Sequence, residues 1–129
     1  TLKDVNGKPV SLSDYKRKLV LVEFWASWCS PCRAESPNLL KQYAAFKDKG
    51  FEILGVSVDS DKAKWLEAIK KDGLTWTQVS DLKGWDNDAR KVYGISGVPA
   101  NFLISADGKI VGNHLMGEEL NKKLAELLN

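Results

Sequence analysis

The stretch LVLVEFWASWCSPC, residues 19–32, holds both cysteines of the chain and decides its fold. Its first eight residues are apolar except for Glu23, which predicts a buried strand. The strand runs directly into a Cys-x-x-Cys turn, and the following apolar periodicity predicts a helix over residues 31–49 that ends at Gly50. Cys29 is therefore expected at the amino end of a helix, where free backbone N–H groups and the helix dipole stabilise a thiolate.

The spacing of the two cysteines favours a reversible disulfide. Residues three apart in a first helical turn lie on one face, so Cys29 and Cys32 are within reach of an unstrained bond. Pro31 fits the same geometry, because a proline in the first turn has no intrahelical N–H bond to lose. The pair is expected to open and close without moving the fold.

The size and charge of the chain narrow the function classes. Residues 1–129 are enough for one domain with a substantial core. The net charge of +2, from 19 basic and 17 acidic residues spread along the chain, argues against a nucleic-acid or membrane-surface partner. No apolar run of about eighteen residues and no signal-peptide pattern is present, and the chain starts at Thr1. We therefore expect the chain to be part of a longer protein.

The remaining pattern alternates strands and helices. A hairpin around Asn6-Gly7 is expected within residues 2–12. Further strands are predicted at 51–58, 74–79, 102–105 and 109–113, and helices at 62–71, 86–93 and 118–128. The first long helix should bury Leu39, Leu40, Tyr43, Ala44 and Phe46, and the second Trp65, Leu66 and Ile69. This order predicts an α/β sandwich with parallel central strands covered on both faces.

The cysteine pair has two alternative interpretations, both less favoured than redox chemistry. A structural zinc site needs four ligands, and His114 is the only histidine in the chain, so no metal site is expected. A purely structural disulfide is also disfavoured, because so short a loop removes little entropy from the unfolded chain.

Two acidic residues and one tryptophan are the other candidates near the dithiol. Glu23 interrupts a buried strand, which favours a carboxyl group that exchanges a proton with Cys32 over a strand-end glutamate paired with a lysine. Glu35 lies on the same helix face as Cys32, and a role near the dithiol and a simple preference for the helix amino end both remain open. Trp25 is expected in the core, whereas Trp28 is expected to form an apolar rim for a docking partner.

These motifs together resemble the thioredoxin superfamily, and within it the TlpA/ResA-type extracytoplasmic thiol-disulfide oxidoreductases. The resemblance covers nearly the whole chain. It is carried by EFWASWCSPCR at 23–33, Glu35, YGISGVP at 93–99, and FLI at 102–104 before Asp107-Gly108. The helix at 62–71 looks like the insertion that separates this branch from plain thioredoxin.

The resemblance implies a three-layer sandwich with a mixed sheet of about five strands. It also implies that Cys29 attacks, that Cys32 resolves, and that Pro99 follows a cis peptide bond facing the sulfurs. Glu23 and Glu35 match acidic positions near the family's dithiol. The residues expected to contact substrate are Trp28, Ser30, Pro31, Val98 and Pro99.

The expected activity is reduction of disulfides in partner proteins, with no cofactor beyond the Cys29–Cys32 disulfide. The implied electron donor is an upstream, membrane-bound thiol protein, and the expected state is a monomer in the bacterial cell envelope. In this interpretation the chain is the C-terminal part of an exported protein, with the targeting segment outside it. Two alternatives are a peroxiredoxin-like peroxidase, against which Ala26 stands where an activating threonine is expected, and a non-catalytic interaction module with an inert dithiol.

Overall fold

The computed structural model describes residues 2–128 and places their strands in one mixed sheet. The sheet order is β2-β1-β5-β4-β3-β6-β7. The strands are β1 (Leu2–Asp4), β2 (Pro9–Val10), β3 (Leu19–Trp25), β4 (Phe51–Ser57), β5 (Gln78–Ser80), β6 (Ala100–Ile104) and β7 (Ile110–Asn113). Strands β3, β4 and β5 are parallel, and the other pairs are antiparallel. Within the described residues the sheet has seven strands rather than about five, because the predicted N-terminal hairpin forms and pairs with β5.

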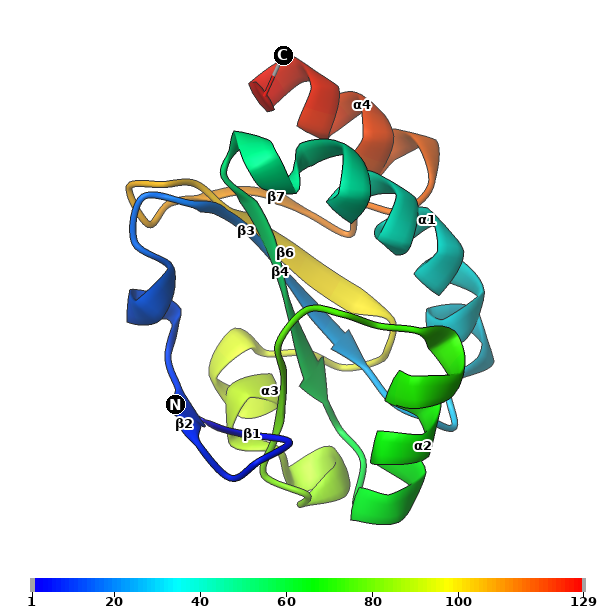
Figure 1. Ribbon diagram of the computed structural model, residues 1–129. Coiled ribbons are helices and arrows are strands. Elements are labelled where there is room, and N and C mark those ends of the chain that lie inside the picture. Colours follow the sequence, from blue (N-terminus) through cyan, green and yellow to red (C-terminus); the bar gives the residue numbers. More distant parts are fainter. Residues whose placement is uncertain (1, 129) are drawn as a thin grey trace.

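Four α-helices flank the sheet in the described part of the chain: α1 (Ser30–Phe46), α2 (Lys62–Asp72), α3 (Asp88–Tyr93) and α4 (Glu118–Leu128). Helices α1 and α4 lie on one side of the sheet, and α3 lies on the other (Figure 1). This arrangement confirms the three-layer, thioredoxin-like sandwich.

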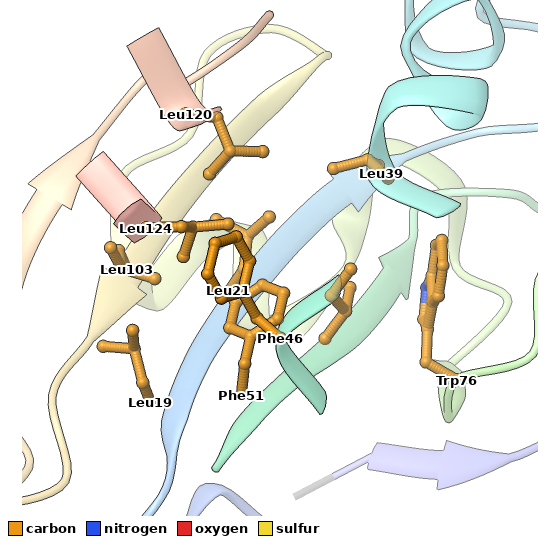
Figure 2. Close-up of a cluster of buried hydrophobic side chains, with 10 residues drawn as sticks. Leu19, Leu21, Leu39, Phe46, Phe51, Trp76, Leu103, Leu120 and Leu124 are labelled. Carbon is orange, nitrogen blue, oxygen red and sulfur yellow. The ribbon is translucent and has the colours of Figure 1, made fainter. Parts of the chain in front are cut away.

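The buried central strand β3 divides the core between the two faces of the sheet. Leu19 and Leu21 pack in the cluster under α1 and α4, whereas Val20 and Val22 pack in the cluster on the α3 side. Figure 2 shows the first cluster, in which Leu120 and Leu124 of α4 approach the sheet. Since side chains alternate along a strand, Glu23 falls on the same face as Leu19 and Leu21, toward α1.

Two helix faces differ from the predicted stripes. On α1, Ala44 is exposed and Gln42 is buried. On α2, Leu66 is 38% exposed, whereas Ala68 is buried beside Trp65. Gln42 and Ala68 take these inward positions because packing decides which face of a helix is buried. Helix α1 packs against the sheet, and α2 packs against α1 and the sheet, so hydrophobicity alone does not set the buried face.

Candidate active site

The two cysteines form a disulfide at the start of α1, directly after the loop that follows β3. Their Cα atoms are 5.3 Å apart. Cys29 is the N-cap of α1, and its Sγ accepts a hydrogen bond of 3.2 Å from the backbone N–H of Cys32. The sulfur predicted to lie at a helix amino end is thus already hydrogen-bonded to one of the free N–H groups there, an environment that stabilises a thiolate.

The rim of the disulfide combines one exposed tryptophan with two small exposed residues. Trp28 is 63% exposed, and Ser30 and Pro31 are exposed as well. Trp25, by contrast, is buried, as expected. An apolar ring that faces solvent beside a redox-active sulfur can contact a partner protein.

The Val98–Pro99 peptide bond is cis, as the resemblance implies. The side chain of Val98 packs against the cluster that contains both cysteines, so this loop and the disulfide belong to one site. Within residues 2–128, the backbone of Val98 forms no hydrogen bond. Its polar groups can therefore pair with an added strand.

Glu23 is a buried carboxyl group, with only 4% of its surface exposed. Its Oε2 accepts a hydrogen bond of 3.1 Å from Asn101 Nδ2, the residue opposite it on β6. Burial raises its pKa to about 8; the Asn101 hydrogen bond lowers the pKa, and the negative charge of Glu35 raises it. No salt bridge joins Glu23 to any residue from 2 to 128, so the alternative of a lysine-paired rim glutamate is wrong.

Glu35 lies close enough to affect Glu23, but its hydrogen bonds run elsewhere. Its Oε2 accepts from Asn38 Nδ2 at 3.1 Å and from the backbone N–H of Gly117 at 2.8 Å. The second bond ties α1 to the loop before α4. Among the described residues, no hydrogen bond joins Glu35 to either cysteine.

A buried aspartate behind the active-site loop, Asp59, is not among the site residues predicted from the sequence. Asp59 accepts hydrogen bonds from the backbone N–H of Ser27 at 3.1 Å, from Ser27 Oγ at 2.5 Å and from Ser57 Oγ at 2.6 Å. Asp61 is the N-cap of α2. The available signal was position, because Asp59 follows β4 and the carboxyl ends of parallel neighbours meet at one edge of the sheet.

A second unpredicted contact fixes the other side of the loop. The Arg33 guanidinium forms a bidentate pair with Asp72, at 2.8 and 2.9 Å, and also donates to the carbonyl oxygen of Ser27 at 3.3 Å. Arg33 therefore ties α1, α2 and the active-site loop together.

The residues of the site are suited to thiol chemistry rather than to metal binding. Across residues 2–128, no group of three or more His, Cys, Asp or Glu side chains is placed to hold a metal ion.

Over the same residues, no helix has the length and apolar character needed to cross a membrane.

A thioredoxin-like sandwich with a Cys-x-x-Cys disulfide after its central parallel strand defines the class of thiol-disulfide oxidoreductases. The chain belongs to the AhpC/TSA family, whose model matches residues 1–112.

The relatives agree with this class. The thiol-disulfide oxidoreductase ResA of Bacillus subtilis is 39% identical over 110 residues, which cover 85% of this chain and 60% of that protein. The ResA of Bacillus thuringiensis is 34% identical, covering 97% of this chain and 70% of that protein. The crystal structure of the thioredoxin domain of a thiol-disulfide oxidoreductase from Bacteroides vulgatus matches with a TM-score of 0.93. It is 45% identical, and the match covers 100% of this chain and 92% of that one.

Proposed function

We propose that this domain reduces disulfide bonds in partner proteins by dithiol exchange through Cys29 and Cys32. The observation that carries the proposal is the position of Cys29 Sγ, which caps α1 and accepts the Cys32 N–H. A sulfur held there is stabilised as a thiolate, the form that attacks disulfides.

The reaction balances in two exchanges. The Cys29 thiolate attacks one sulfur of the partner disulfide, so that a mixed disulfide forms and the other partner sulfur leaves as a thiolate. Cys32 then attacks Cys29 Sγ, the Cys29–Cys32 bond forms and the second partner sulfur leaves. Two electrons pass from the domain to the partner, and the proton of Cys32 goes to the Glu23 carboxylate beneath it. Glu35 assists by its charge, since it raises the pKa of Glu23.

The partner segment is proposed to bind across the exposed rim of the disulfide. Trp28 offers an apolar face, Ser30 and Pro31 are exposed between the two cysteines, and Val98 before cis-Pro99 offers backbone hydrogen bonds to an extended chain. This arrangement suits an extended segment of a disulfide-containing protein.

Net reduction is favoured over oxidation because Ser30-Pro31 lacks the histidine that stabilises the thiolate in strongly oxidising relatives. The upstream electron donor is proposed to be a membrane-bound thiol protein, and no cofactor is needed beyond the disulfide. We place the protein in the bacterial cell envelope as a monomer. We also propose that residues 1–129 form a single thioredoxin-like domain, which is the C-terminal part of an exported protein.

Two alternative functions, a peroxiredoxin-like peroxidase and a non-catalytic interaction module, can be distinguished from dithiol exchange by their chemistry. A peroxidase needs a hydroxyl donor beside its cysteine, and the residue three before Cys29 is Ala26, which is fully buried and has no hydroxyl. Rapid consumption of peroxide by the reduced protein would favour that alternative. A non-catalytic module would retain its biological activity after Cys29→Ser.

The test uses each cysteine variant in turn. Cys32→Ser is expected to accumulate mixed disulfides through Cys29, and Cys29→Ser to abolish dithiol-dependent reduction of insulin. Glu23→Gln is expected to slow exchange with the fold retained. Absence of the trapped species in Cys32→Ser contradicts the assigned roles of the two cysteines.

A further inference from the structure

Four residues form a row across the centre of the sheet beneath the dithiol. Glu23 on β3 pairs with Asn101 on β6 and with Gly55 on β4, and Gly55 pairs with Gln78 on β5. Paired residues of neighbouring strands point to the same face, which here is the face covered by α1. The row therefore places two amide side chains on either side of the Glu23 carboxyl group.

Gly55 lets Gln78 reach toward Glu23. A Cβ at position 55 would lie 2.1 Å from Gln78 Oε1 and 2.7 Å from its Nε2. The Gln78 side chain thus occupies the space over Gly55 that any other residue would fill, and the strand between Glu23 and Gln78 offers no side chain to separate them.

The orientation of the Gln78 amide is set by Trp25. The indole Nε1 of Trp25 donates to Gln78 Oε1 at 2.8 Å. Because an indole N–H is a donor only, it fixes the amide oxygen on its own side and directs Nε2 the other way. The amide nitrogen is therefore the free end of this side chain.

Two buried polar atoms of opposite sense remain without partners among the described residues. They are Gln78 Nε2, a donor, and Glu23 Oε1, an acceptor when ionised. Each is costly to bury without a hydrogen bond. Both residues line one small cavity of about 10 Å³, together with Cys32 and Ser36. A single water needs about 10–15 Å³ and two or more polar partners, so the cavity fits one water molecule.

We propose that Gln78 is a positioning residue that holds one water molecule between its Nε2 and Glu23 Oε1, and that this water carries the Cys32 proton to Glu23. The inference rests on the proposed function, since it concerns the second exchange. As Cys32 Sγ bonds to Cys29 Sγ and the partner sulfur leaves as a thiolate, the Cys32 proton passes to the water and a water proton passes to Glu23.

Few titratable groups lie near Glu23, so the direction in which Gln78 shifts the pKa of Glu23 can be stated. The titratable groups near Glu23 are Cys32 and Glu35, both on α1. The residues facing it from β4, β5 and β6 are Gly55, Gln78 and Asn101, which carry no charge. A water that donates to Glu23 favours its ionised form, and loss of its anchor is expected to raise the pKa of Glu23 further.

The test separates the two exchanges. In a Cys32→Ser background, stopped-flow kinetics measure the attack of Cys29 on a disulfide peptide. With Cys32 present, they measure the decay of a mixed disulfide preformed at Cys29. Gln78→Leu is expected to slow the second step about tenfold at neutral pH and to move the midpoint of its pH profile upward, since a base below its pKa is mostly protonated. The first step should change by less than about twofold, because it does not use Glu23.

Two further variants serve as a matched pair. Gly55→Ala places a Cβ against the Gln78 amide and is expected to give the same split between the steps. Gln42→Leu removes an amide from a buried position on α1 outside the cavity and should leave both steps unchanged. A high-resolution crystal structure of the wild-type protein should place a water within about 3.2 Å of both Gln78 Nε2 and Glu23 Oε1.

The outcomes distinguish the inference from the proposed function. If Gln78→Leu leaves the second step and its pH profile unchanged, or slows both steps equally, the role given to Gln78 is wrong. Absence of the water at high resolution also overturns it. If the wild-type protein forms no mixed disulfide through Cys29, the proposed function itself fails.

Discussion

Asp59 accepts both the backbone N–H and the hydroxyl of Ser27, at 3.1 and 2.5 Å, so that a buried carboxylate after β4 holds the loop that leads from β3 to Cys29. The same carboxylate also binds Ser57 at the end of β4. The loop that carries the disulfide is therefore fixed from beneath by one side chain and from the α2 side by Arg33.

Replacing this carboxylate should be costly even with an isosteric residue. In Asp59→Asn one acceptor oxygen becomes an NH₂ group that faces the donors of Ser27 and Ser57. We expect a loss of about 1–3 kcal/mol in the free energy of unfolding, measured by urea denaturation. Asp61→Asn is the matched control, because asparagine caps a helix about as well as aspartate and the change should stay within about 0.5 kcal/mol. Equal losses in the two variants would contradict the role given to Asp59.

The buried Glu23 predicts a pH-dependent gain in stability for Glu23→Gln in the oxidised protein. Its pKa is raised from 4.5 to about 8 on folding. Below pH 4.5 the carboxyl group is protonated in both states and costs nothing. Between these two values only the unfolded chain ionises, so wild-type stability falls as the pH rises, and above about 8 the cost is constant.

The advantage of Glu23→Gln should therefore grow from near zero in acid to the order of a few kcal/mol in mild alkali. Urea denaturation at a series of pH values measures it. A constant difference between the two proteins across this range would show that Glu23 does not titrate as its burial requires.

Trp28 should matter for partner binding and not for folding. Because its side chain is 63% exposed, Trp28→Ala is expected to change the free energy of unfolding by no more than about 0.5 kcal/mol. The same variant should raise the KM for a protein disulfide several-fold, since an exposed aromatic ring at a docking rim loses contact area. Trp65→Ala, at a buried position, should instead cost about 3–5 kcal/mol of stability. An unchanged KM in Trp28→Ala contradicts the docking rim.

The chain pattern predicted the layers of the fold because its strongest signals are local. The apolar run at 19–26 became β3, and the predicted bounds of the last helix match α4. Strand β5 was misplaced, covering Gln78–Ser80 instead of 74–79, because Trp76 before it packs edge-on against Tyr43 of α1 and does not pair in the sheet. Apolar residues that pack in a loop give the same local signal as those in a strand.

The site was predicted in part for a similar reason. The burial of Glu23 follows from its own strand, and the position of Cys29 follows from the strand-to-helix junction. Gln78 carries no comparable signal, since its partner Trp25 is 53 residues away in the sequence. Nothing in the sequence marks Gly55 within its strand, and only the strand register shows that it lies between Glu23 and Gln78. Contacts across the sheet depend on register, which a single sequence does not encode locally.

The ionisation of Cys29 in the reduced protein tests the account most directly. Thiolate absorbance near the ultraviolet edge, followed across pH in Cys32→Ser, reports this one sulfur. We predict that the pKa of the Cys29 thiol lies below the ordinary value of about 8.5 and that Cys29 reacts rapidly with disulfides at neutral pH. A sulfur that stays protonated into the alkaline range and reacts slowly would contradict it.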